Sequence, residues 1–232
     1  MDYDYRTIVG RLLADGDVDA AAASFVAPVR SADDPEAVLW VAWEAVASAA
    51  AAGDPVARER LVALVAAVQC SDDERTVWGL RLFADLPVLG AQLREEWNRT
   101  PAEGRPVDEW TGLNAFAAGL SVSVGDYLLL GLWTVATALE TFAEPRDHVP
   151  AAAAWFELAG PQLASATLHG RTYAARLGEL ASSAGVAEGG FSVPRWTFWR
   201  SRLEALAREG DESARRGFQA IKKYDRKIAG RL

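Results

Sequence analysis

Two Asp-Pro steps, Asp34-Pro35 and Asp54-Pro55, constrain the fold of this chain most strongly. An aspartate side chain can cap the free amides at a helix start, and proline suits the first helical position because its φ is already fixed. Apolar residues then recur at three- and four-residue spacings, which is the period of one helix face. The two steps therefore predict an antiparallel helix pair whose first helix ends at Gly53.

The rest of the chain has a similar helical pattern. About 45 of the 232 residues are alanine, which loses no side-chain entropy in a helix. No run alternates between apolar and polar residues as a half-buried strand would. Further helices are expected over 4–14 and 17–29, from Pro87, and after a loop at Pro101–Pro106 as a helix that carries Trp110 and Leu120. Four more are expected over about 125–143, 149–185 with breaks near Gly160-Pro161 and Gly170, 194–208 and 211–229.

This pattern predicts an all-α fold. We expect a single irregular helical bundle of about 8–10 helices that starts with antiparallel helix pairs and forms one domain over residues 1–232. A short helical-repeat solenoid is the alternative, because the first two helix pairs have similar lengths.

The charge is unevenly distributed. The chain has 24 lysine and arginine residues against 32 aspartate and glutamate residues, which gives a formal charge of -8 at pH 7. Ten of the basic residues and only five acidic ones lie in residues 200–232. With its apolar stripe, the segment 211–232 is predicted to be a basic amphipathic C-terminal helix. The negative total disfavours nucleic acid as a partner, since binding to phosphates needs a broad basic surface.

Hydropathy predicts no membrane span. The most apolar run, residues 127–139, has 13 residues, whereas a helix needs about 20 to cross a bilayer. The first six residues are polar and acidic and lack the cationic and apolar parts of a secretory signal. We expect a cytoplasmic location.

Several common chemistries are disfavoured by composition. The chain has two histidines, one cysteine and one methionine, too few for a disulfide framework or a multi-histidine metal centre. His148 and His169 lie on different segments, and neither has a second histidine one helical turn away. No nucleophile elbow, phosphate-binding Gly-Lys loop or dinucleotide fingerprint occurs. We expect no metal and no cofactor.

Several short phrases follow one another in the central and C-terminal parts of the chain. They are Trp78-Gly79, Asp85-Leu-Pro-Val-Leu-Gly90, Arg94-Glu-Glu-Trp-Asn98, Trp110, Leu113-Asn-Ala-Phe-Ala117 and Phe191-Ser-Val-Pro-Arg-Trp-Thr-Phe-Trp199. Together they resemble a largely fungal family of all-helical proteins of unknown function, over about residues 38–210. The resemblance implies an all-α fold and supplies no established activity, cofactor or catalytic residue.

Two carboxylates are candidate catalytic groups. Asp85 precedes Leu86-Pro87, where a helix is expected to restart, and its side chain could cap that helix. Glu96 flanks the apolar stripe that includes Leu93 and Trp97. If both carboxylates instead face a cavity, desolvation would raise the pKa of one of them, which could then act as a general acid or base.

A second set of residues is predicted to bind a ligand. Asn114 lies on or beside an apolar helix face, so its amide either ties helices together or orients a ligand. Arg195 lies one turn before Trp199. It either folds over an aromatic ring or pairs with a carboxylate in the core, or it clamps a ligand carboxylate or phosphate. Nine tryptophans are more than a core of this size usually needs, which favours a pocket. The predicted ligand-binding residues are Trp97, Trp110, Asn114, Trp133, Arg195, Trp196 and Trp199.

These residues favour a protein that binds a small organic or peptide-like molecule in a Trp-rich pocket between helices. Two alternatives stay open. One is a metal-independent enzyme of specialised metabolism that uses Asp85 or Glu96 as acid or base. The other is a protein–protein scaffold or homo-oligomerisation module built on the alanine-rich helix pairs or the C-terminal helix.

Overall fold

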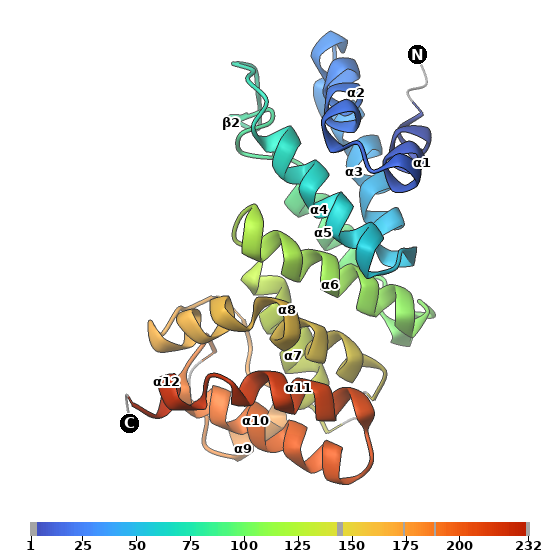
Figure 1. The fold of residues 1–232 in the computed structure, drawn as a ribbon. Coiled ribbons are helices and arrows are strands. Elements are labelled where there is room, and N and C mark those ends of the chain that lie inside the picture. The colour runs from blue at the N-terminus through green and yellow to red at the C-terminus, as the bar shows by residue number, and fades with distance from the viewer. Residues whose placement is uncertain (1–3, 143–145, 174, 188, 231–232) are drawn as a thin grey trace. The chain divides into compact units, whose positions relative to one another are not determined.

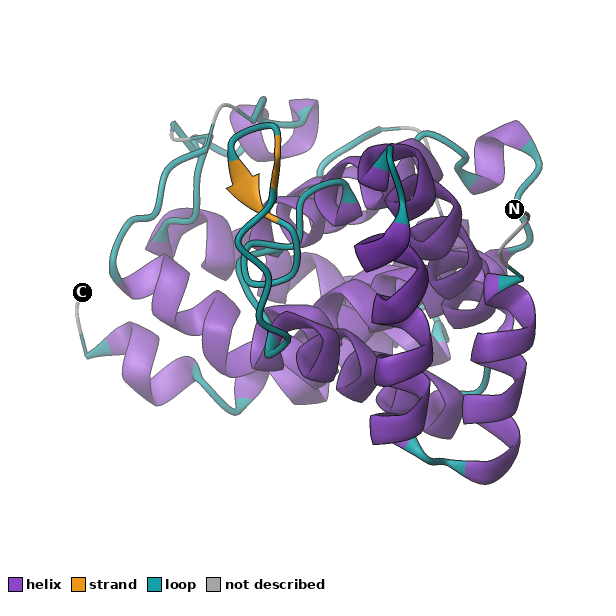
Figure 2. Ribbon diagram, turned by 90° about the horizontal axis from the view of Figure 1, so that it is seen from above, coloured by secondary structure: helices purple, strands orange, loops and turns teal. Residues whose placement is uncertain are grey.

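The computed structural model describes residues 4–142, 146–173, 175–187 and 189–230. Its regular structure is helical apart from one small hairpin, so the all-α prediction is confirmed (Figures 1 and 2). The chain divides into two compact units, residues 1–116 and 117–232, called unit 1 and unit 2 below. The organisation of residues 1–232 as one domain stays a prediction.

Unit 1 begins with two helix pairs at the predicted places. Asp34 Oδ1 accepts a hydrogen bond from Ala37 N at 3.1 Å, and Asp54 Oδ1 accepts one from Ala57 N at 2.8 Å. The predicted caps are therefore confirmed. The elements of unit 1 are α1 (Tyr5–Asp15), α2 (Val18–Ser31), α3 (Pro35–Ala52), α4 (Pro55–Gln69), β1 (Thr76–Val77), β2 (Leu80–Arg81), α5 (Leu89–Trp97), a 3-10 turn (Pro101–Glu103) and the first part of α6 (Val107–Ser123).

Aromatic side chains join the first three helices of unit 1. The ring of Phe25 on α2 lies 4.6 Å from that of Trp43 on α3 and 5.1 Å from that of Tyr5 on α1, measured between centroids. The Tyr5 hydroxyl donates to the carbonyl of Phe25 at 3.2 Å. All three side chains are buried, so one aromatic cluster fixes these helices to one another.

A tight hairpin interrupts the helices around Trp78. β1 and β2 pair antiparallel, with Val77 opposite Leu80. The two residues between them, Trp78 and Gly79, have φ values of 56° and 77°. Positive φ at both central residues is the geometry that matches the twist of a two-residue hairpin. Periodicity does not reveal this hairpin, because each strand has only two residues.

Unit 2 contains the end of α6 and the remaining helices. They are α7 (Leu128–Leu139), a 3-10 turn (Arg146–His148), α8 (Val149–Leu168), α9 (Glu179–Ser183), α10 (Val193–Arg208), α11 (Glu212–Lys222) and α12 (Asp225–Ala229). The helix predicted over 149–185 bends at the predicted place, since Ala159 has non-helical angles just before Pro161. It ends at Leu168, and α9 is the next helix among the residues that the structure describes.

The C-terminal segment differs from its prediction. It forms α11 and α12 rather than one helix, because Lys223 N and Tyr224 N bond to carbonyls three residues back, which tightens the turn. The ring of Tyr224 then lies over Gly160 on α8, where an added Cβ would be 2.7 Å from Tyr224 Cε2. Residues 231–232 of the predicted helix lie outside the described residues.

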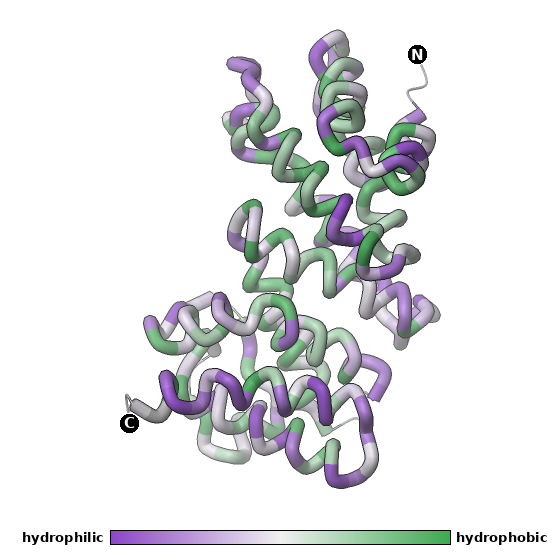
Figure 3. Tube along the Cα trace, in the orientation of Figure 1, coloured by the Kyte–Doolittle hydropathy of each residue, from purple (hydrophilic) through white to green (hydrophobic). Residues whose placement is uncertain are grey.

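Small residues let α7 and α11 approach α8 closely. The Trp155 ring on α8 lies over Gly131 on α7, where an added Cβ would be 2.8 Å from the ring. Gly217 on α11 stands against Ala153 on α8 in the same way, at 3.2 Å. Along α11, hydrophobic and hydrophilic residues are mixed (Figure 3), as expected when only one face of that helix is buried.

His148 makes the stability of unit 2 depend on pH. The residue is buried, and burial lowers its pKa below the usual 6.5, although the charge of Asp147 acts in the opposite direction. The unfolded chain therefore takes up a proton at a higher pH than the folded chain, so folded stability falls as pH drops below about 6.5. We expect the free energy of unfolding, measured with urea at about pH 7.5 and 5.5, to fall more for the wild type than for His148→Gln. Equal decreases in the free energy of unfolding of the two proteins would contradict the assignment of this pH dependence to His148.

Candidate functional site

The first candidate acid or base, Asp85, lies at the surface beside the hairpin. Its Oδ2 accepts a hydrogen bond from Arg81 N at 2.8 Å, and its Oδ1 lies 3.0 Å from Arg81 Nη2. These hydrogen bonds from the Arg81 side chain and backbone lower the pKa of Asp85. Asp85 does not cap the next helix, since α5 is preceded by Val88 and has no side-chain cap. A carboxylate with a lowered pKa is a weak proton acceptor and is ionised at neutral pH.

The second candidate, Glu96 on α5, is buried and paired with other residues. Its carboxylate forms an ion pair with the buried Arg105, and its Oε2 lies 3.8 Å from Arg99 Nη1. Asp85 and Glu96 are thus bound to different arginines. Their role as catalytic groups stays a prediction.

Three of the predicted ligand-binding residues pack against one another in unit 1. The rings of Trp97 and Trp110 lie 4.9 Å apart between centroids, tilted by 59°. Asn114 is fully buried and donates through Nδ2 to the carbonyl of Trp110 at 2.9 Å, one turn back in α6. This hydrogen bond fits the structural role predicted for Asn114. Its alternative role, orienting a ligand, stays a prediction.

Arg195 at the start of α10 is fully buried in unit 2 and forms a two-pronged ion pair with Glu140. The Nε–Oε1 distance is 2.6 Å and the Nη2–Oε2 distance is 3.0 Å. Its Nη1 donates to the carbonyls of Gly189 and Gly190. All three nitrogens of this guanidinium are therefore bound inside the protein.

Glu140 is the centre of this buried network. Its Oε1 also accepts from Trp199 Nε1 at 2.6 Å, and its Oε2 from Gly178 N at 2.9 Å. Sequence analysis did not select Glu140. The available signal was its position, a single acidic residue directly after the most apolar run of the chain.

The remaining tryptophans of the predicted set also lie in unit 2. Trp196 is buried edge-on against Phe156 and Tyr224, at 5.8 and 6.4 Å between centroids. Trp133 on α7 is partly buried. The predicted set is therefore divided between the two units, and most of its rings pack against other core side chains.

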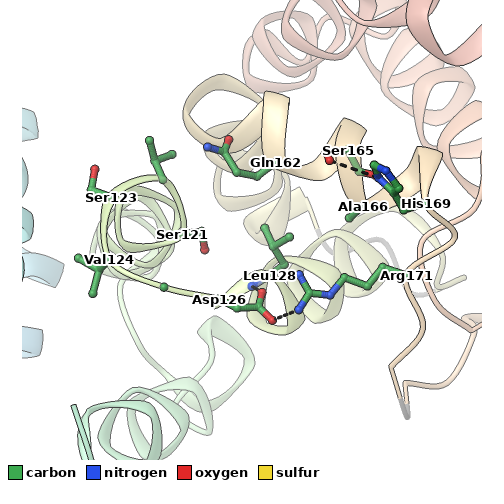
Figure 4. A pocket seen from close by; sticks show the side chains of 12 residues that line it. Ser121, Ser123, Val124, Asp126, Leu128, Gln162, Ser165, Ala166, His169 and Arg171 are labelled. Atoms are coloured by element: carbon green, nitrogen blue, oxygen red, sulfur yellow. Dashed lines mark hydrogen bonds and ion pairs between the residues drawn. The ribbon is translucent and has the colours of Figure 1, made fainter. Parts of the chain in front are cut away.

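A cavity of about 700 Å³ lies in unit 2 (Figure 4). Its lining comes from two stretches of the chain, residues 121–128 and 162–171, and none of the lining residues is a tryptophan. The polar lining residues are Ser121, Ser123, Asp126, Gln162, Ser165, His169 and Arg171. Except for His169, which was considered only as a metal ligand, sequence analysis did not select them.

Two helix ends shape this cavity. After α6, both Val124 N and Gly125 N donate to the carbonyl of Leu120, which ends the helix and turns the chain. After α8, Arg171 N returns to the carbonyl of Ala166 at 2.9 Å. These turns carry the side chains of Asp126 and Arg171 to the same edge of the cavity (Figure 4).

Asp126 and Arg171 form an ion pair at this edge, and their side chains are 40% and 45% exposed. The hydroxyl of Tyr173 donates to Asp126 Oδ2 at 3.2 Å. Burial and the neighbouring Asp126 raise the pKa of Tyr173 to about 12, so its hydroxyl stays protonated and acts as a donor at neutral pH. The edge therefore offers a ligand both a carboxylate and a guanidinium.

Gln162 and His169 on the α8 side supply neutral groups. His169 Nδ1 lies 2.8 Å from the carbonyl of Ser165, so in a neutral ring Nδ1 carries the proton and Nε2 is an acceptor. Gln162 Oε1 is buried and has no hydrogen-bond partner within the described chain. A buried acceptor without a partner costs about 1–3 kcal/mol, which a ligand donor could recover.

Neither a metal-binding cluster nor a membrane-spanning helix is found in the part of the chain that the structure describes. No group of three or more histidine, cysteine, aspartate or glutamate side chains there could hold a metal ion. None of its helices combines the length and the apolar character that a transmembrane segment requires.

Comparisons with known proteins match the middle of the chain. Residues 43–203 fit the model of a family described as "Protein of unknown function (DUF3632)". No curated protein and no solved structure matched the chain. All the residues that line the cavity lie inside the matched range.

Proposed function

This chain belongs to the DUF3632 family of proteins of unknown function, and we propose that it binds a small organic or peptide-like molecule in the cavity of unit 2. The observation that carries the proposal is a cavity of about 700 Å³ at which a charged pair and neutral hydrogen-bonding groups converge. Sites for small molecules usually have volumes of roughly 300–1,000 Å³ and a few convergent polar groups. The proposed site is therefore this cavity rather than a Trp-rich one.

The charged edge favours a ligand that carries both signs of charge or several amide groups. Asp126 accepts hydrogen bonds and suits an ammonium or amide donor. Arg171 uses Nη2 for Asp126 within the described chain, which leaves Nε and Nη1 for a carboxylate or carbonyl oxygen. Amino acid derivatives and short peptides have this pattern of groups.

The neutral side of the cavity adds acceptors. His169 Nε2 can receive a hydrogen bond from a ligand N–H or O–H group, and so can Gln162 Oε1, which is buried, when its side chain turns toward the ligand. A ligand that only supplies acceptors would leave Gln162 Oε1 without a partner and would bind less tightly. This combination supports a peptide-like molecule over a simple anion.

The test is to remove the cationic half of the charged edge. We expect Arg171→Gln to bind the co-purifying ligand about 10-fold or more weakly, because a hydrogen bond to a charged group contributes roughly 1.5–3 kcal/mol. Native mass spectrometry of protein purified from its own host would detect the ligand as extra mass, and calorimetry with the extracted ligand would give the affinity.

Arg146→Gln is the matched control. Arg146 also lies in unit 2, is 50% exposed and forms an ion pair with Glu209, but it does not line the cavity. The proposal expects this variant to bind like the wild type. It would be overturned if the wild type carried no ligand and bound none of a set of amino acids and short peptides, or if Arg171→Gln bound as tightly as Arg146→Gln.

A further inference from the structure

Trp78, at the tip of the hairpin in unit 1, is one of three non-glycine residues with a positive φ in the described part of the chain. Its φ of 56° lies in the left-handed region, which bulky residues rarely adopt. Its side chain is 54% exposed, so burial in a core does not explain a tryptophan here. Asparagine or glycine would fit this turn with less strain.

Two residues at the start of α3 lie beside the Trp78 ring. The ring of Trp40 lies 6.3 Å from it between centroids, and the two planes meet at 64°. Glu36 Oε2 accepts a hydrogen bond from Trp78 Nε1 at 3.0 Å. Two angled indole rings and a carboxylate therefore meet at one place on unit 1.

This combination suits a cation that carries alkyl groups. A cation is attracted to a tryptophan face when it lies within about 6 Å of the ring centroid. The Trp40 and Trp78 centroids are 6.3 Å apart and the ring planes are angled by 64°, so a cation placed over the face of one ring also lies close to the other ring. Methyl groups on the cation would contact the apolar ring surfaces, and the charge of Glu36 would favour a positive ligand over a neutral or negative one.

We propose that Trp40, Trp78 and Glu36 form a binding site for a methylated or quaternary ammonium group. The site lies in unit 1 and is separate from the cavity residues of unit 2, so it does not depend on the function proposed above. The strained backbone at Trp78 serves to present the indole ring at the tip of the hairpin. The group can belong either to a free small molecule or to a methylated lysine of a peptide.

The experiment titrates the full-length protein with tetramethylammonium chloride at constant ionic strength, followed by tryptophan fluorescence and NMR of the indole N–H groups. tert-Butanol is the neutral probe of similar shape. We expect saturable binding of tetramethylammonium, with shifts at the indole signals of Trp40 and Trp78, and at least about twofold weaker binding of tert-butanol, since the charge contributes roughly 0.5–2 kcal/mol.

Trp78→Asn removes the ring without endangering the fold, because asparagine tolerates the left-handed conformation. We expect its thermal transition to lie at or above that of the wild type and its saturable binding to be lost. Glu36→Gln keeps the shape of the site and should weaken binding by a few-fold, in a way that high salt reduces. Glu44→Gln, a change at another partly exposed carboxylate of α3, is the control and should bind like the wild type.

Two further ligands distinguish the sources of the group. Choline represents a free quaternary amine, and a short peptide with one trimethyllysine represents a modified protein. Tighter binding of either supports the site and identifies its source. The proposal is overturned if tetramethylammonium and tert-butanol bind equally, or if Trp78→Asn retains the binding of the wild type.

Discussion

Glu140→Gln is expected to lower the free energy of unfolding by about 3–5 kcal/mol. Glu140 and Arg195 are fully buried, and the substitution leaves the guanidinium of Arg195 without its counter-charge. Breaking a buried pair by removing one partner is costly because the other charge stays buried and uncompensated. Urea unfolding followed by circular dichroism measures the loss.

Glu209→Gln is the matched control for this prediction. Glu209 pairs with Arg146 at the surface, with both side chains at least half exposed. Exposed pairs contribute up to about 1 kcal/mol, so this variant should differ little from the wild type. Similar losses in Glu140→Gln and Glu209→Gln would contradict the view that the buried pair holds α10 to the end of α7.

Gly112→Ala is expected to destabilise unit 1 by about 3 kcal/mol. A Cβ added at Gly112 on α6 would lie 2.3 Å from the carbonyl oxygen of Ala51 on α3 and 3.1 Å from that of Ala50. Because both neighbours are backbone atoms, the helices would have to separate to relieve the overlap. Chemical denaturation of the variant measures the cost.

Gly10→Ala provides the opposite expectation for the same substitution. Gly10 lies inside α1, and an added Cβ there would meet nothing within 4 Å. Alanine should therefore stabilise the protein by about 0.5–1 kcal/mol, because it restricts the unfolded chain and favours the helix. If both variants were stabilised, the inference that α3 and α6 approach each other closely at Gly112 would be wrong.

Local signals in the sequence predicted much of the fold. Asp34 and Asp54 cap the helices that follow them because an N-cap depends on residues within one turn. The bend near Pro161 was predictable for the same reason, since proline removes a backbone donor. The hairpin at Trp78 was not, because its conformation contradicts the usual preference of tryptophan.

The candidate site depended on contacts between distant segments and was less predictable. One interpretation of Arg195 paired its side chain with a carboxylate. Nothing in the sequence indicates that this carboxylate belongs to Glu140, 55 residues earlier. Tryptophans line pockets and fill cores alike, so their number did not distinguish the two. The cavity itself comes from chain turns after α6 and α8, and its charged pair joins residues 45 positions apart.

An amide NMR titration of the full-length protein, with the ligand extracted from protein purified from its host, tests directly whether the cavity of unit 2 binds that ligand. If the ligand binds in the cavity, the largest shift changes occur within residues 121–128 and 162–171, the two stretches that supply its lining. Changes centred on Trp97, Trp110 and Asn114 instead, with the cavity signals unmoved, would contradict binding in the cavity and would favour the tryptophan cluster of unit 1 as the binding site.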